Sequence, residues 1–148
     1  MSVFSIFPME RNDVKTLAEL EQQCFSQPWN EQMLGEELDN RTAHFLVAKQ
    51  DGVIAGYIGV FVVCESCYIS NIAVFPCFRR QGAAKLLLQS ACEIAFENGA
   101  ESVSLEVRPS NNEAVSLYAK MGFEEVGLRK NFYRKPVEDA LILTKTLS

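Results

Sequence analysis

The stretch "VFPCFRRQGAAKLLLQSACEIAF", residues 74–96, marks the point where the chain changes from strands to a long helix. From residue 83 to residue 98 the apolar positions follow helical spacing, and Gly99 supplies a C-terminal stop. The apolar positions are Ala84, Leu87, Leu88, Ala91 and Ala95. Strand patterns precede and follow this helix, at 68–74 and 102–107. A strand, a crossover helix and a strand form a βαβ unit, so the two strands are predicted to be parallel, with a right-handed connection.

The segments before this unit predict a meander of strands. A first strand is expected at 3–7, and Asp51-Gly52 between two apolar runs is a hairpin signal. Two helices are expected after the first strand. Asn12 is the predicted cap of one, whose apolar stripe is Val14, Leu17, Leu20 and Cys24, and Asn30 is the predicted cap of a short helix through Leu38.

The segments after the unit predict one more helix and two strands. Ser110-x-x-Glu113 has the form of a capping box, and Gly122 ends the helix that follows. Strands are expected at 123–129 and 140–147, on either side of a loop that contains Pro136. The predicted fold class is α/β, with a mixed sheet that is antiparallel at both ends and parallel in the middle. One domain, residues 1–148, is expected.

Composition excludes several function classes. The net charge of −5 argues against a general nucleic-acid-binding protein. The longest apolar run, Val53–Cys64, is 12 residues long, whereas a membrane span needs about 20. The N-terminal residues show no signal-peptide pattern, so a cytoplasmic protein is expected.

The five cysteines and the single histidine predict no metal site. An odd number of cysteines without a secretion signal indicates free thiols. Cys64 and Cys67 form one C-x-x-C pair, but no second pair or nearby histidine completes a zinc site. His44 is interpreted as structural.

The basic turn before the helix has two interpretations. Arg79, Arg80 and Lys85 surround the small residues 82–84, which could be a solvated loop. Alternatively, the unpaired N–H groups of a helix N-terminus, together with these cations, form a binding site for a phosphate-bearing ligand. The spacing matches neither the P-loop nor the Rossmann fingerprint.

The motif Arg79-Arg80-Gln81-Gly82-Ala83-Ala84 resembles the Q/R-x-x-G-x-G/A signature of the GCN5-related N-acetyltransferases (GNAT). The resemblance covers essentially the whole chain. Three segments, "ISNIAVFPCFRRQGAAKLLL", "LEVRPSNNEAVSLYAKMGFEEVGLRKNFY" and "EDALILTKTL", are similar to the RimI branch of this family, the ribosomal-protein alanine N-acetyltransferases.

The resemblance implies transfer of an acetyl group from acetyl-CoA to a protein N-terminus, with a ribosomal protein as partner. In the family, the strand residues that match Ile72, Ala73 and Val74 pair with the pantetheine arm, and the turn holds the pyrophosphate. Asn111 matches a further cofactor contact. The turn residues assigned to the cofactor are Arg79, Arg80, Gln81, Gly82, Ala83, Ala84 and Lys85.

Glu106 matches the family's general base and Tyr118 its general acid. Taken alone, Glu106 could be a solvated carboxylate and Tyr118 a packing residue. A direct mechanism is sufficient for an α-amine, because about a tenth of it is neutral at pH 7. A carboxylate can then take the proton, directly or through a water, and a tyrosine can protonate the departing thiolate.

The sequence says less about the residues that bind the acceptor substrate than about those that bind the cofactor. Trp29 can be a core residue or can line the peptide groove, and Tyr133 borders the other side, where the loop "RKPV" looks shorter than in typical family members. The acidic residues Glu36, Glu37, Asp39, Glu138 and Asp139 predict a negative electrostatic field that attracts a basic peptide. Acetylation of a lysine or a small amine, and a non-catalytic acyl-CoA-binding module, are the alternatives. The oligomeric state is not indicated.

Overall fold

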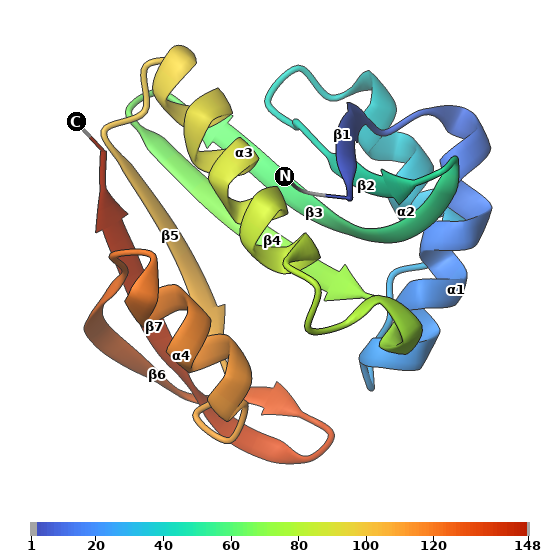
Figure 1. Cartoon of the computed structure of the whole chain (residues 1–148). Helices are drawn as coiled ribbons and strands as arrows, with labels where there is room; N and C mark the ends of the chain where they lie inside the picture. Colours follow the sequence, from blue (N-terminus) through green and yellow to red (C-terminus); the bar gives the residue numbers. More distant parts are fainter. Residues whose placement is uncertain (1–2, 148) are drawn as a thin grey trace.

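The predicted strand–helix–strand unit lies at the centre of a seven-stranded sheet in the order β1-β2-β3-β4-β5-β7-β6 (Figure 1). The structure is a computed structural model that describes residues 3–147. The strands are β1 (Ser5–Pro8), β2 (Leu46–Gln50), β3 (Val53–Val63), β4 (Ser66–Val74), β5 (Ser102–Val107), β6 (Glu124–Arg134) and β7 (Val137–Thr146). The α-helices are α1 (Val14–Cys24), α2 (Glu31–Glu36), α3 (Ala83–Glu97) and α4 (Asn112–Lys120). Among the strands of residues 3–147, only β4 and β5 pair in parallel, so the predicted mixed α/β fold is confirmed.

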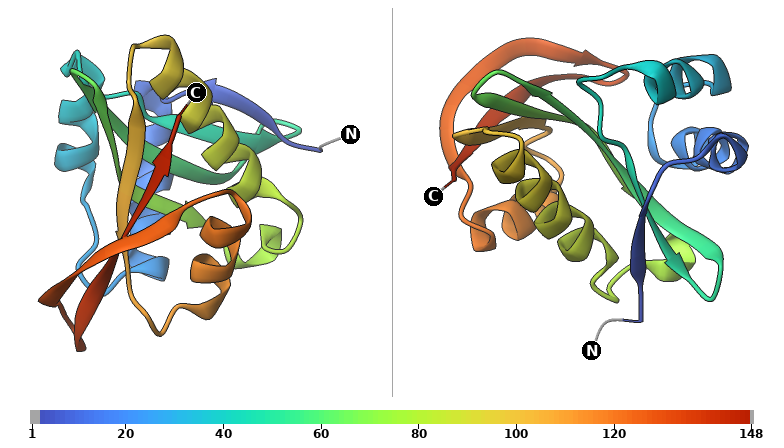
Figure 2. Two further views of the ribbon diagram at one scale, coloured as in Figure 1. Left: turned by 90° about the vertical axis from the view of Figure 1, so that its left-hand side faces the viewer. Right: turned by 90° about the horizontal axis from the view of Figure 1, so that it is seen from above.

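Helices cover the two faces of the sheet, with α3 and α4 on one face and α1 and α2 on the other (Figure 2). Successive side chains of a strand point to opposite faces of the sheet, so the core consists of two clusters, one on each face. Leu46 and Ile58 pack in the cluster that contains α3, whereas Val47 and Tyr57 pack in the cluster that contains α1. The centre of the sheet is therefore buried on both sides.

The parallel strands β4 and β5 separate before either one ends. Their pairing runs from Ser66↔Ser102 to Ile69↔Leu105, but β4 continues to Val74 and β5 to Val107. Against β3, Asn71 pairs with Gly59 and Ile69 with Val60, so Ser70 is an extra residue, as in a β-bulge. Past this bulge, the edge of β4 that faces β5 pairs with no strand in the described part of the chain. Figure 1 shows the two strands diverging at this end.

The starts of two helices differ from the sequence-based prediction. Asn12 does not cap α1, because it lies inside a 3₁₀ helix, Arg11–Asp13, in which Asp13 accepts a hydrogen bond from the Glu10 N–H at 2.8 Å. The Asn30 cap of α2 is confirmed, since its Oδ1 accepts from the Met33 N–H at 2.9 Å.

The capping box predicted for α4 is also wrong. Asn111 is the cap and accepts from the Ala114 N–H at 3.3 Å. Ser110 instead donates its backbone N–H and its hydroxyl to the Glu138 carboxylate of β7, both at 2.9 Å. The capping role therefore passes to the next residue.

The C-terminal hairpin is longer than predicted. β6 and β7 continue to a turn at Lys135-Pro136, so most of residues 130–139 lie in strands rather than in a loop. The pairing is interrupted between Arg129 and Tyr133, where Asn131 has φ +53°. This bulge and the exposed polar residues around it hide the strand pattern in the sequence. No helix within the described range 3–147 is long and apolar enough to cross a membrane.

We expect Gly56→Ala to destabilise the fold by about 1–3 kcal/mol. A Cβ atom at residue 56 would lie 2.5 Å from the Ala73 carbonyl oxygen and 3.0 Å from the Val74 Cγ2, so β3 and β4 must move apart. Urea unfolding measures the loss. Gly127→Ala is the matched control, because its Cβ would meet Ile142 Cδ1 at an ordinary 3.4 Å. Equal losses in both variants would contradict the close approach at Gly56.

Candidate active site

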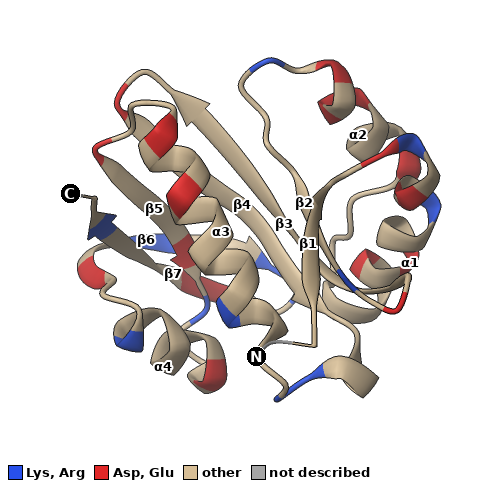
Figure 3. Cartoon of the chain, turned by 45° about the horizontal axis from the view of Figure 1, so that its top comes forward, with Lys and Arg blue, Asp and Glu red and all other residues tan. Residues whose placement is uncertain are grey.

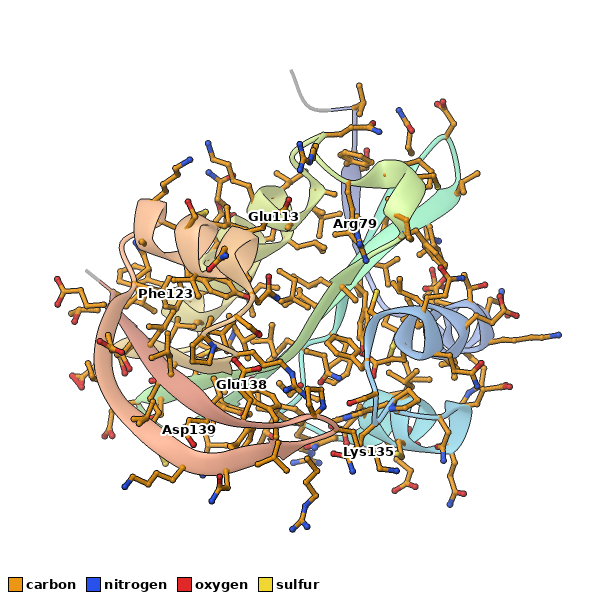
Figure 4. All side chains as sticks on the ribbon, turned by 90° about the horizontal axis from the view of Figure 1, so that it is seen from below. Arg79, Glu113, Phe123, Lys135, Glu138 and Asp139 are labelled. Carbon is orange, nitrogen blue, oxygen red and sulfur yellow. The ribbon has the colours of Figure 1, made fainter. Side chains whose placement is uncertain are left out.

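A cleft of about 570 Å³ opens where β4 and β5 separate. Its floor is the diverging pair of strands, one wall is the segment that joins α1 to α2, and the other is the β6–β7 hairpin. Figure 4 shows the hairpin tip, marked by Lys135, reaching toward α1 and α2. The residues that line the floor include Tyr68, Ile72, Leu105 and Glu106, and those on the walls include Phe25, Trp29, Phe132 and Tyr133.

A second hollow of about 310 Å³ lies beside the turn that precedes α3. Ile72 and Tyr118 border both hollows, so the two spaces meet at these side chains. Most of the predicted cofactor residues line this second hollow, namely Ile72, Val74, Arg79, Arg80, Gly82, Ala83, Ala84 and Lys85. Ala73 points to the other face, into the cluster with α1.

The turn before α3 presents backbone N–H groups and basic side chains together. Gly82 is the N-cap residue, with φ +90°, and its carbonyl accepts the Leu86 N–H, so the N–H groups of the first turn have no helical partner. Arg80, with φ +63°, forms an ion pair with Glu113 at 2.9 Å, and both side chains are exposed. This geometry suits an anionic group such as a pyrophosphate.

The other predicted turn residues have their own contacts. Arg79 folds back, and its Nε donates to the Val74 carbonyl at 3.0 Å. The Gln81 Nε2 donates to the Cys77 carbonyl at 3.3 Å, and Asn111 caps α4 outside the lining of either hollow. Arg79 thus stabilises the end of β4, while Arg80 and Lys85 carry the exposed charge.

Glu106 lies on the floor of the cleft, near the end of β5. One carboxylate oxygen accepts from the Tyr68 hydroxyl at 2.5 Å, and the other contacts Arg129 Nε at 2.9 Å. The Glu106 side chain is only 6% exposed, which separates it from an ordinary solvated carboxylate. Burial, and then the hydrogen bond to Glu106, raise the pKa of Tyr68, so this phenol keeps its proton at neutral pH.

Tyr118 is buried between α4 and the point where the two hollows meet. Its ring packs against Phe123 at 5.8 Å between centroids. Burial raises the pKa of Tyr118 above that of a free tyrosine, and no other described residue hydrogen-bonds its hydroxyl. The hydroxyl is therefore a protonated donor with no partner among residues 3–147.

The two predicted substrate residues stand on opposite walls. The backbone N–H of Trp29 donates to Glu21 Oε1 at 2.9 Å. The centroid of its ring lies 6.0 Å from that of Phe45, so Trp29 both packs in the core and lines the cleft. Tyr133 lies under the Arg108 guanidinium, which is 4.2 Å from the ring centroid. Burial, followed by the charge of Glu106, raises the pKa of Tyr133 to about 12.

The comparisons with known proteins agree with this geometry. Residues 14–123 match the acetyltransferase (GNAT) family. The chain belongs to this family. The acetyltransferase is 32% identical over 146 residues to the ribosomal protein bS18-alanine N-acetyltransferase of Escherichia coli strain K12, covering 97% of this chain and 98% of that protein. It is 40% identical over 141 residues to a Bacillus subtilis protein provisionally assigned the same activity, covering 95% and 93%.

Solved structures show the same fold. The crystal structure of the Escherichia coli ribosomal-protein-S18-alanine N-acetyltransferase superposes on this acetyltransferase with a TM-score of 0.89 and 30% identity, over 98% of this chain and 94% of that one. Ard1 from Thermoplasma volcanium superposes with a TM-score of 0.91 and 22% identity, over 99% of each chain. Two further neighbours of the fold, the NatC complex and a Thermoplasma acidophilum acetyltransferase, were solved with coenzyme A. Family membership confirms acetyl-CoA as the expected cofactor.

The electrostatic prediction for the substrate side is not supported by the contacts of this acetyltransferase. The carboxylates at 36–39 do not line the cleft, and Glu138 is held by Arg108 and Ser110. Asp139 accepts from the Asn131 N–H at 2.8 Å. Figure 3 shows acidic positions on several elements, including α1, α2 and α3. On the hairpin side, Arg108 and Lys135 line the cleft, and Arg108 is paired with Glu138.

Sequence reasoning missed four residues that organise the site. Tyr68 and Arg129 contact Glu106, and Arg108 joins the end of β5 to the hairpin through the Pro136 carbonyl at 2.9 Å and Glu138 at 3.3 Å. Glu21 is the fourth. A partial signal existed for Arg108, which directly follows a predicted strand, but the pairing of Arg129 with Glu106 depends on the bulged strand β6.

Glu21 is a buried carboxylate of α1, 1% exposed, beneath the cleft. It accepts hydrogen bonds from the Trp29 N–H, from the Tyr57 hydroxyl at 2.6 Å and from Asn71 Nδ2 at 3.2 Å. These three donors come from the α1–α2 segment, β3 and β4. One side chain therefore holds the α1–α2 segment against the sheet at the point where β4 begins to diverge.

We expect Glu21→Gln to lower the free energy of unfolding by on the order of 2–4 kcal/mol, because its amide group places a donor against donors inside the core. Thermal and urea unfolding provide the measurement. Glu19→Gln on the exposed side of the same helix is the control and should change stability by less than about 0.5 kcal/mol. A Glu21→Gln variant as stable as the control would show that the three hydrogen bonds contribute little.

Proposed function

We propose that the protein is an Nα-acetyltransferase, which moves an acetyl group from acetyl-CoA to the N-terminal amine of a protein. The observation that carries the proposal is the continuity of the two hollows. The anion-binding turn of α3 connects, past Tyr118, to a cleft whose floor holds the shielded carboxylate of Glu106.

Acetyl-CoA would lie along β4 with its pyrophosphate at the turn. The free N–H groups at the start of α3, with Arg80 and Lys85, supply hydrogen bonds and positive charge for two phosphates. The edge of β4 beyond Ile69 has no partner on the β5 side, so its backbone can pair with the amide groups of the pantetheine arm. The thioester would then reach the junction at Tyr118.

The chemistry proposed for the cleft is direct attack by the amine on the thioester carbonyl. Glu106 is the base that finally holds the amine's proton, and Tyr118 protonates the departing CoA thiolate. A protonated, buried tyrosine fits the second role, since its raised pKa keeps the proton available at neutral pH. Roles for Trp29 and Tyr133 follow from their positions, as the two walls between which a peptide N-terminus would enter.

The proposed substrate is an N-terminal alanine, that of a ribosomal protein S18. The relatives that cover almost the whole chain carry this activity in their names. The extended walls suit a chain end rather than a small free amine, because both the α1–α2 segment and the hairpin border the cleft. Because Glu36, Glu37 and Asp39 do not line the cleft, we base the proposed substrate on the relatives and the cleft shape, and the attraction of a basic peptide stays a prediction.

A peptide panel tests the proposal. The protein is mixed with acetyl-CoA and with Ala-initiated, bulky-initiated and N-terminally blocked lysine-containing peptides, and the products are read by mass. We expect the Ala-initiated peptide to have the highest kcat/KM. Faster acetylation of an internal lysine or of a free polyamine would overturn the N-terminal assignment, and no transfer to any amine would leave only an acyl-CoA-binding protein.

Arg80→Ala should raise the Kd for acetyl-CoA about tenfold or more, because it removes a charge-assisted phosphate contact worth about 1.5–3 kcal/mol. Isothermal titration gives the value. Lys130→Ala removes the same charge from an exposed position of β6 that lines neither hollow, and it should leave the Kd within about twofold. An unchanged Kd for acetyl-CoA in Arg80→Ala would indicate that Arg80 belongs to a solvated loop and does not contact the phosphates.

Glu106→Gln should lower kcat steeply at pH 7, by about 10²-fold or more, while the Kd for acetyl-CoA stays nearly constant. The loss should shrink toward about pH 9.5, where the α-amine is already neutral. Initial rates at several pH values with saturating substrates provide the measurement. A loss that is the same at both ends of the pH range would indicate a structural role for Glu106.

A further inference from the structure

Glu106 lines the cleft, but its carboxylate offers an incoming amine little accessible surface. Its two oxygens are occupied, Oε1 by the Tyr68 hydroxyl and Oε2 by Arg129, and its side chain is 6% exposed. A base takes a proton only on an oxygen that the donor can approach within hydrogen-bond distance. A proton path through one of the two covering groups is therefore favoured over direct contact with the carboxylate.

The two covering groups differ in what they can do. A guanidinium has five N–H donors and no acceptor, and it stays protonated in proteins, so Arg129 cannot receive a proton. A phenol has one O–H donor and can also accept. Tyr68 uses its donor on Glu106, and its remaining lone pairs are free to accept a hydrogen bond from a group in the cleft.

Tyr68 is also the accessible member of the pair. It is 41% exposed and lines the same cleft as Tyr118 and Ile72. Its parallel-pair partner is Ser104, so Glu106 is two residues further along β5 on the same face of the sheet. The phenol thus stands between the open cleft and the shielded carboxylate.

We propose that Tyr68 is a catalytic residue that contacts the acceptor amine and relays its proton to Glu106. The inference rests on the proposed function and extends it, because it names the atom that the amine meets. Glu106 then acts through the Tyr68 hydroxyl rather than through direct contact.

The step balances without any further reactant. The amine lone pair forms the C–N bond to the thioester carbonyl carbon, and the C–S bonding pair leaves with sulfur. Before this attack, a proton of the ammonium form passes to Tyr68 Oη as the phenolic proton passes to Glu106 Oε1, so Tyr68 ends neutral and the nitrogen lone pair is free. The proton that the nitrogen loses after the attack passes to water. The thiolate takes the Tyr118 proton, and exchange with water resets Glu106 and Tyr118.

The groups around Tyr68 are consistent with this path. The titratable and charged groups that face it are Glu106 from β5 and Arg129 and Tyr133 from β6. Burial is the largest cause of its raised pKa, and Glu106 is the next, so the proton resides on Tyr68 before the amine arrives. Arg129 keeps the other Glu106 oxygen occupied, which directs the proton to the Tyr68 side.

The test compares Tyr68→Phe, Glu106→Gln and the double variant, using acetyl-CoA and whichever amine the wild-type protein acetylates in the peptide panel. We expect Tyr68→Phe to lower kcat about 10²-fold with an unchanged Kd for acetyl-CoA. The double variant should be no slower than Glu106→Gln alone, since both changes interrupt one path. Losses that multiply, or a Tyr68→Phe variant within about twofold of wild type, would overturn the relay.

Two further variants separate a relay from a structural role. Ser104→Ala removes the neighbouring hydroxyl, which contacts Thr144 rather than Glu106, and should leave kcat unchanged. Tyr68→His can still accept and pass on a proton, so it should be faster than Tyr68→Phe, and equal rates for the two would contradict the proposal. If the wild-type protein preferred lysine, the N-terminal assignment would be wrong but the relay could still hold. If Tyr68→Phe were as active as the wild type, the relay would be wrong but the N-terminal assignment would still hold.

Discussion

The early end of the β4–β5 pairing is the constraint on which the rest of the structure depends. Beyond Ile69 and Leu105 the two strands diverge, and an extra residue at Ser70 changes which side chains of β4 face α1. Unpaired backbone groups inside a sheet are costly unless another group satisfies them. The fold therefore exposes a strand edge at its centre, and everything that we assign to the reaction is arranged around that edge.

Polar contacts, buried around Glu21 and partly exposed around Arg108, hold the two sides of this opening. Glu21 joins α1 and the α1–α2 segment to β3 and β4, while Arg108 joins the end of β5 to the hairpin turn. One network fixes each wall. These contacts fix the positions of both walls relative to the sheet. Fixed walls suit the proposed reaction, in which an amine, a thioester and two proton-transfer groups must lie within hydrogen-bond distance.

Much of the fold could be read from local patterns, and the failures have identifiable causes. The βαβ unit, the Asp51-Gly52 hairpin and the Asn30 cap are encoded by neighbouring residues, and all are present. The α1 cap fails for a local reason, because the contact between Glu10 and Asp13 forms a 3₁₀ turn before the helix. The α4 cap depends on a distant partner, Glu138, and the extent of β6 depends on a bulge at Asn131. The residues around Glu106 follow the same rule. Glu106 itself could be placed at a strand end, but Arg129 reaches it from a strand whose register is irregular.

The pairing of Arg80 with Glu113 has a consequence for how the protein responds to its ionic surroundings. Arg80 carries its own counter-ion on α4, so an arriving phosphate exchanges with a carboxylate instead of meeting a bare charge. In such an exchange the number of small ions released to solution is smaller than the count of cations at the turn would suggest. The affinity for a polyanion would then vary little with salt, and weakly held anions would compete poorly for the turn. At the proposed pyrophosphate site, Glu113 would thus lower the net positive charge that a phosphate meets at Arg80.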